Sequence, residues 1–234
     1  MNDDLARAMA SRDVAAPVRE VAVWDLPTRL FHWAIVFLIG FSWLSAEQEW
    51  MDWHLRSGYA ILTLLLFRLL WGIFGSQTAR FTQFLAGPRA VLRHLARLPR
   101  RAPDRAVGHN AAGGWMVVLM LVLLSVQAGT GLFSNDDIMT EGPCADVVGK
   151  EISDWLTHIH RLNFTLIEIV VAVHILAVLT YAVVKRHDLV RPMLSGRKRL
   201  PAALPAPRMR HPLLALGLLL VAAGVVTFVV NHPW

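Results

Sequence analysis

Long apolar stretches separated by short polar segments dominate this chain of 234 residues. A helix needs about 20 residues to cross the hydrocarbon core of a bilayer, and the first stretch reaches that length when it is extended over residues 27–45. Lipid offers the backbone no hydrogen-bond partners, so such stretches form helices. The pattern predicts an all-α integral membrane protein. The five stretches are 30–44, 53–74, 111–133, 164–184 and 213–230.

The composition agrees with a membrane location. Hydrophobic residues make up 55% of the chain and charged residues 17%, whereas soluble domains carry about 25% charged residues. We expect a cytoplasmic segment over residues 1–22, a transmembrane domain over 23–200 and a C-terminal transmembrane helix within 201–234. The polar, acid-containing start argues against a cleaved signal peptide. The single cysteine, Cys144, excludes an internal disulfide and a covalent CxxCH haem attachment.

Lysine and arginine alternate between high and low numbers along the polar segments. Residues 1–29 carry four, 45–52 none, 75–110 seven, 134–160 one and 185–210 eight. Basic residues are retained in the cytoplasm, so the N-terminus is expected inside and the C-terminus outside. The net charge of +6 then reflects topology. Because the basic residues are divided among segments that flank the membrane, no nucleic-acid partner is expected.

Four histidines lie in or at the ends of the first, second and fourth stretches, where ionisable residues are costly and often functional. His160 and His174 are 14 residues apart, about 21 Å along a helix and nearly four full turns, so they share one face. His158 is 16 residues from His174 and points to the opposite side. The four histidines are His32, His54, His160 and His174.

The expected topology sorts these histidines by depth. His54 and His160 lie near the outer surface, and His32 and His174 near the inner one. Two imidazoles from facing helices can supply both axial ligands of a haem iron. Zinc is the competing metal, but it prefers four ligands and each pair supplies two. The histidines therefore favour two haems, one at each depth.

Several motifs resemble the bacterial cytochrome b561 and nickel–iron hydrogenase cytochrome b subunit family, over about residues 21–200. They are VWDLPTRLFHW, WHLRSGY followed by FRLLWGIFG, GHNAAGGW, and the two histidines of the fourth stretch. The resemblance implies a four-helix transmembrane bundle with two haem b groups whose ligands match His32, His54, His160 and His174. The fifth stretch departs from the four-helix pattern, and its Gly217 and Gly224 suit close helix packing.

Two arginines are candidates for binding haem propionates. Arg68 is 14 residues after His54 and lies on the same helix face at the inner depth. It either pairs with a propionate of the inner haem or extends to the cytoplasmic surface. Arg29, beside His32, is a similar candidate.

Glu168, in the middle of the fourth stretch, is either a proton relay or a paired interior carboxyl.

The sequence GHNAAGG begins the third stretch at the inner depth. Its glycines allow close backbone approach, and its polar side chains offer hydrogen bonds. His109, Asn110 and Gly113 either border a quinone site beside the inner haem or simply start a tightly packed helix. His109 is expected to hydrogen-bond rather than to bind iron.

The resemblance implies an electron carrier of the bacterial inner membrane. It would link the quinone pool of a respiratory chain to a periplasmic redox protein or enzyme subunit: a hydrogenase, a molybdoenzyme or a c-type cytochrome. Quinone would be a substrate, membrane lipid a partner, and a homodimer is left open. No residue is expected to do chemistry beyond electron and proton transfer at quinone. The alternative is a stand-alone superoxide:quinone oxidoreductase. A transporter would have inverted repeats and broken helices, and the sequence has neither.

Overall fold

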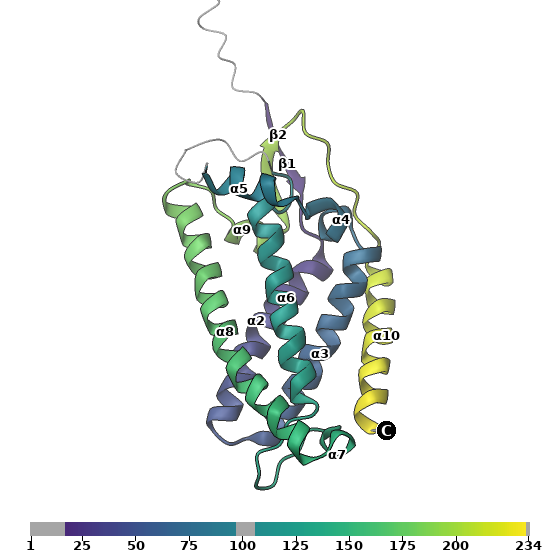
Figure 1. Ribbon diagram of the computed structural model, residues 1–234. Coiled ribbons are helices and arrows are strands. Elements are labelled where there is room, and N and C mark those ends of the chain that lie inside the picture. The colour runs from purple at the N-terminus through teal and green to yellow at the C-terminus, as the bar shows by residue number, and fades with distance from the viewer. Residues whose placement is uncertain (1–16, 97–105, 233–234) are drawn as a thin grey trace, which may run out of the picture.

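The computed structural model describes residues 17–96 and 106–232. In this part of the chain, five long helices run alongside one another, and short elements cover both ends (Figure 1). The elements are β1 (Val18–Ala22), α2 (Leu26–Glu47), α3 (Met51–Phe74), η1 (Gln77–Ala79), α4 (Phe81–Phe84), α5 (Pro88–Ala96), α6 (Ala111–Gly131), α7 (Ala145–Val148), α8 (Lys150–Val183), α9 (Val190–Ser195), β2 (Arg197–Pro201) and α10 (Pro212–Asn231).

Helices α2, α3, α6 and α8 share one apolar core. α2 packs on α3, α3 on α6, and α6 on α8. Each of the four helices contributes at least one buried side chain, which ties the bundle together near the middle of the helices. These residues are Ile35, Ile61, Leu65, Leu121, Leu124 and Ile167.

The start of α2 is fixed by its sequence. Asp25 is the N-cap residue, and its Oδ1 accepts a hydrogen bond of 2.7 Å from the backbone N–H of Thr28. Pro27 stands in the first turn, where its missing N–H costs nothing. The other carboxylate oxygen, Oδ2, accepts a bond of 3.1 Å from Nε1 of Trp71 on α3. One side chain therefore starts α2 and attaches it to α3.

The fifth helix, α10, packs on the outside of α3. Its buried contact residues are Ala215, Ala222 and Val226. Gly217 and Gly224, which the sequence suggested for close packing, have no atoms within 4 Å of where a Cβ would stand. Within this chain, therefore, α10 turns its alanines rather than its glycines toward α3, and close packing of the glycines against another helix stays a prediction.

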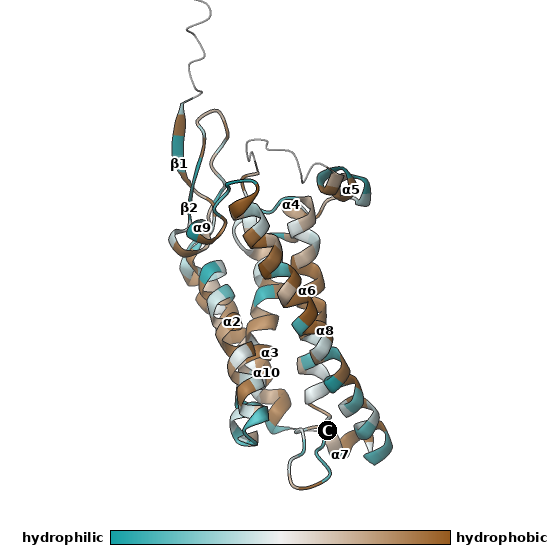
Figure 2. Ribbon diagram, turned by 90° about the vertical axis from the view of Figure 1, so that its left-hand side faces the viewer, coloured by the Kyte–Doolittle hydropathy of each residue, from teal (hydrophilic) through white to brown (hydrophobic). Residues whose placement is uncertain are grey.

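The two ends of the bundle differ. At one end, β1 pairs antiparallel with β2, and α4, α5 and α9 lie nearby (Figure 1); we call this the sheet end. The other end carries α7 and the last described residues of α10, and we call it the α7 end. Hydrophilic residues gather at the two ends, and the middle of the helices is mainly hydrophobic (Figure 2).

Five helices, α2, α3, α6, α8 and α10, are long and apolar enough to cross a membrane. The expected fold class, a helical membrane bundle of four helices with a fifth C-terminal helix, is confirmed. The short β1–β2 ladder is an addition that the sequence reading did not contain. It joins the segment before α2 to the segment after α9, across what the sequence treated as domain boundaries.

Candidate haem-binding site

His54 on α3 and His160 on α8 face each other toward the α7 end. Their ring centroids are 6.1 Å apart, and the ring planes make an angle of 79°. Two imidazoles that bind one metal ion from opposite sides, with metal–nitrogen bonds of about 2 Å, have ring centres about 6 Å apart. The pair therefore has the spacing that one shared metal ion requires. His158 is exposed, as its position on the opposite face of the helix predicts.

Both imidazoles are oriented by backbone carbonyl groups. Nδ1 of His54 is 2.9 Å from the carbonyl oxygen of Ser42, and Nδ1 of His160 is 2.9 Å from that of Gln127. A carbonyl can only accept, so each Nδ1 carries the proton and donates it. Nε2 is then the unprotonated nitrogen, which is the form that binds a metal. The Oγ1 of Thr130 lies 3.2 Å from Nδ1 of His160 and adds a second polar contact.

The surroundings of His160 hold α6 and α8 close together. A Cβ on Gly131 would lie 3.0 Å from Cε1 of His160, so only glycine leaves the ring its full space. The buried Asn163 donates from Nδ2 to the carbonyl of Leu123 at 2.9 Å and to Oε1 of Gln127 at 2.8 Å. The sequence reading missed these residues, because their contacts cross from one helix to another.

His32 on α2 and His174 on α8 form the second pair, toward the sheet end. They lie within electrostatic range of each other, and His109 lies within electrostatic range of both of them and of Arg68. The structure thus gathers four of the predicted residues around one place. Nδ1 of His32 has no hydrogen-bond partner among the described residues.

His109 is enclosed by aromatic rings. Its ring centroid is 4.6 Å from that of Trp24 and 4.8 Å from that of Phe84. Burial, together with the nearby charge of Arg68, lowers the pKa of His109 to about 3. The imidazole is therefore neutral at physiological pH.

Arg68 lies inside the bundle rather than extending to the surface, with 3% of its area exposed. Its Cζ is 5.1 Å from the ring centroid of Phe81, and the charge of Asp25 acts on it. Its Nη1 has no partner among the described residues, and the same is true of the buried Nε atoms of Arg80 and Arg29. Unpartnered buried guanidinium groups are costly. This end of the bundle therefore suits a ligand that brings carboxylates.

Arg29 also has a structural contact. Its Nη1 donates to the carbonyl oxygen of Leu194 at 2.5 Å, which attaches the start of α2 to α9. Arg80, which the sequence reading did not select, stands just before α4. Nothing in its local sequence distinguishes it from the other arginines of the same segment.

Asn110 and Gly113 stand at the start of α6. Oδ1 of Asn110 accepts a 2.8 Å bond from the backbone N–H of Gly113, so Asn110 caps the helix. Its Nδ2 donates to the hydroxyl of Tyr181 at 3.0 Å. Among the glycines at this helix start, the closest backbone approach belongs to Gly114, where a Cβ would stand 2.7 Å from the carbonyl oxygen of Phe84. Both Asn110 and Gly113 therefore have structural contacts, and a role toward quinone stays a prediction.

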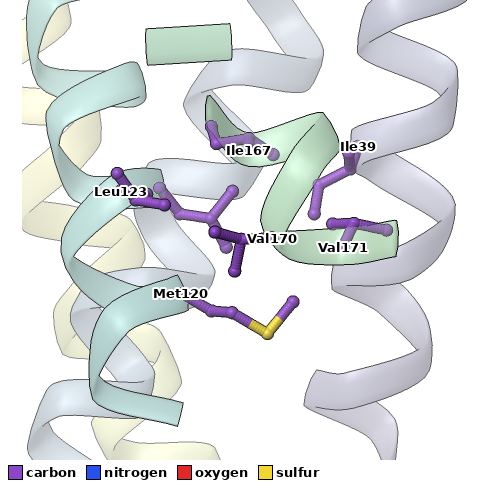
Figure 3. A pocket seen from close by; sticks show the side chains of 7 residues that line it. Ile39, Met120, Leu123, Ile167, Val170 and Val171 are labelled. Carbon is purple, nitrogen blue, oxygen red and sulfur yellow. The ribbon is translucent and has the colours of Figure 1, made fainter. Parts of the chain in front are cut away.

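An apolar cleft lies between the two histidine pairs, among α2, α6 and α8 (Figure 3). Its walls carry only aliphatic and thioether side chains, so it separates the two pairs with a layer that holds no charge. The lining residues are Ile39, Met120, Leu123, Leu124, Ile167, Val170 and Val171.

The ligand sets suit haem better than zinc. Within residues 17–96 and 106–232, no three side chains of His, Cys, Asp or Glu come together as a metal-binding group. A tetrahedral zinc site needs about four ligands, whereas haem, whose macrocycle supplies four nitrogens, needs only axial ligands from the protein. Glu168, expected in the interior, is exposed on α8.

A comparison with known protein families gives a match. Residues 23–196 match the family model described as prokaryotic cytochrome b561. The searches of curated proteins and of solved structures give no match. The matched region contains all four histidines and covers most of the chain, so the protein belongs to the prokaryotic cytochrome b561 family, whose members are membrane b-type cytochromes.

Proposed function

We propose that the protein is a diheme cytochrome b that transfers electrons between the quinone pool and a redox partner outside the cytoplasm. The observation that carries the proposal is the facing of His54 and His160, with ring centroids 6.1 Å apart and both Nδ1 atoms bonded to carbonyls. His32 and His174 are the ligands of the second haem. A bound haem supplies one-electron transfer at each level.

The proposed orientation places the sheet end in the cytoplasm of a bacterium and the α7 end in the periplasm. It is supported by the numbers of basic residues, since the segments 75–110 and 185–210 carry seven and eight Lys and Arg and the segment 134–160 only one. In this orientation the inner membrane holds five spans, with the N-terminus inside and the C-terminus outside.

Arg68 and Arg29 are proposed to pair with propionates at the sheet end. The support is the buried Nη1 of Arg68 and Nε of Arg29, which lack partners among the described residues. A guanidinium forms paired, charge-assisted hydrogen bonds with carboxylates. Binding the propionates would therefore give these donors the partners that a buried cation needs.

The quinone site is proposed at the sheet end, bordered by His109, Asn110 and Gly113. The proposal is supported by the position of His109, which is neutral and lies within electrostatic range of His32 and His174. Asn110 directly follows His109 in the sequence. Quinone carbonyls and quinol hydroxyls are recognised by polar side chains of this kind. A substrate here would exchange electrons with the inner haem directly.

The redox partner is proposed to dock at the α7 end. That end carries an excess of acids, so a partner with a basic patch would be attracted. The acids are Glu47, Glu49, Asp52, Asp136, Asp137, Glu141, Asp146, Glu151 and Asp154. The same charge would slow the approach of anionic superoxide, so we prefer a protein partner to the superoxide oxidase alternative.

A pyridine haemochrome assay tests the number of haems, and the expected result is two non-covalent haem b groups per chain. His160→Ala should remove the haem at the α7 end and His174→Ala the haem at the sheet end. The exposed His158→Ala is the matched control and should retain both. One haem or none in well-folded protein would contradict the diheme proposal. Turnover of superoxide by the isolated protein would instead support the alternative function.

A further inference from the structure

A tyrosine, a histidine and an asparagine from three separate helices meet at the sheet end. The hydroxyl of Tyr181 on α8 is 2.7 Å from Nε2 of His94 on α5. The same hydroxyl accepts a 3.0 Å bond from Nδ2 of Asn110 at the start of α6. These residues are far apart in sequence, so the fold itself creates the cluster.

The cluster leads from the inner histidine pair toward the surface. Tyr181 follows His174 by seven residues, nearly two full turns, so it lies on the same face of α8 about 10 Å nearer the sheet end. Asn110 follows His109, which lies within electrostatic range of His32 and His174. Polar groups therefore continue from the proposed quinone site to Tyr181.

His94 lies on a helix whose sequence suits the edge of the bilayer. Its helix, α5, has exposed apolar residues, Leu92 and Leu95, together with the exposed Arg93. This mixture is typical of helices that lie in the interface between lipid and water. His94 is half-buried, and its Nε2 contacts the hydroxyl of Tyr181. Its imidazole therefore stands between the interior of the protein and the aqueous phase.

We propose that Tyr181 and His94 form the proton path of the quinone site, with Asn110 positioning the tyrosine hydroxyl. The inference rests on the proposed function. Oxidation of a quinol to a quinone releases two electrons and two protons, and a haem held by His32 and His174 would accept the electrons one at a time. Each proton must leave separately for the cytoplasm, or enter by the same route when quinone is reduced.

The chemistry of the two side chains fits this task. A phenol donates one hydrogen bond and accepts up to two, so it can take a proton from a neighbour while it passes its own to Nε2 of His94. Histidine titrates near neutral pH and can release the proton to water. The ammonium group of Lys185, with Nζ 5.4 Å from the ring centroid of Tyr181, stabilises negative charge that develops on the phenol oxygen.

The experiment uses the full-length, haem-loaded protein in lipid nanodiscs. Stopped-flow absorbance follows haem reduction by short-chain ubiquinol and menaquinol, in H₂O and in D₂O. General acid–base groups contribute about a hundredfold or more, so Tyr181→Phe and His94→Gln should slow quinol-driven reduction by about a hundredfold. Haem content and reduction by dithionite should stay unchanged. Imidazole added to His94→Ala should restore a large part of the rate.

The chain offers matched controls. Tyr59→Phe changes the other of its two tyrosines, and His158→Gln changes an exposed histidine; both should behave as wild type. If quinol reduces the wild type and the relay variants within twofold of each other, the relay is rejected and the quinone site is not. If neither quinol reduces the wild type, the proposed quinone function fails as well. A slow variant with no imidazole rescue and an unchanged solvent isotope effect would assign Tyr181 and His94 a structural role and reject the relay.

Discussion

Asp25 offers the sharpest test of how this bundle is held together. Its carboxylate is buried, with 9% exposed, and accepts from the N–H of Thr28 at 2.7 Å and from Nε1 of Trp71 at 3.1 Å. Replacing it with alanine removes the cap of α2, which costs about 1 kcal/mol. It also leaves the indole N–H of the fully buried Trp71 without a partner, which costs about 1–3 kcal/mol. We expect Asp25→Ala to lower the free energy of unfolding by about 2–4 kcal/mol.

The two contributions can be separated. Asp25→Asn keeps one acceptor for Thr28 but cannot accept from Trp71 at the same time. In the Trp71→Phe background that lost bond no longer matters, so the cost of Asp25→Asn should fall by about 1 kcal/mol. Unfolding by sodium dodecyl sulfate in mixed micelles, followed by circular dichroism, measures each free energy.

Asp52 provides the matched control, because it is an exposed acid in the first turn of α3 and makes no N-cap bond. Asp52→Ala should stay within about 0.5 kcal/mol of wild type. If Asp25→Ala has an equally small effect, the two hydrogen bonds do not stabilise the junction of α2 with α3, and the reasoning is refuted.

Three further predictions concern other regions. Gly131→Val should disturb the haem at the α7 end and leave the one at the sheet end, because even a Cβ would stand 3.0 Å from Cε1 of His160; low-temperature spectra of the two haems check this. Asp136 accepts backbone bonds from residues 138, 139 and 140, which lower its pKa from 3.8 to about 2. Because its pKa is lowered, the ionised carboxylate stabilises the loop above about pH 4. This stabilisation is lost as the pH falls toward 2 and the carboxylate is protonated. The protection factors of the loop amides, which correct for the intrinsic pH dependence of exchange, should therefore fall over that range, and Asp136→Ala should abolish this fall. Glu168→Leu should leave both haems bound, since the side chain is exposed on α8; loss of a haem would show that this carboxyl acts inward.

The sequence contained the information that sets helix positions and depths. Apolar length predicts the spans, and helical spacing predicts that His160 and His174 share a face. The alternation of basic residues predicts the direction of the spans, which stays a prediction. Each of these depends on a single helix and its surroundings. The cap at Asp25 could also have been predicted, since an aspartate shortly before a proline is typical of a helix start.

Contacts between helices could not be predicted in the same way. Trp71 bonds to a residue 46 positions earlier, and β1 pairs with a strand about 180 positions later. Nothing in the local sequence of either partner indicates which distant residue it will contact. The alanines of α10 and its glycines are both small, and only the orientation of the helix decides which set meets α3. Tyr181 lies on the predictable face of α8, but nothing in the sequence indicated that His94 would reach it.

The buried Arg68 leads to a last prediction, on the potentials of the two haems. A positive charge favours the reduced state of a nearby haem, because reduction removes one positive charge from the iron. At an effective dielectric constant of about 20, a charge about 10 Å away contributes about 1.7 kcal/mol. That equals about 70 mV for one electron. His54 is 14 residues from Arg68, about 21 Å along α3, so the effect at the α7 end should be about half as large.

Arg68→Gln should accordingly lower the midpoint potential of the haem at the sheet end by several tens of millivolts, and that of the other haem by about half as much. Spectroelectrochemical titration resolves the two potentials. Arg56 on the same helix is the control, because it is exposed and stacks over Trp53 with its Cζ 5.3 Å from the ring centroid. Water and salt screen an exposed charge, so Arg56→Gln should change either potential little. Equal shifts of both haems in Arg68→Gln, or no shift at all, would show that the guanidinium does not act on the haem at the sheet end.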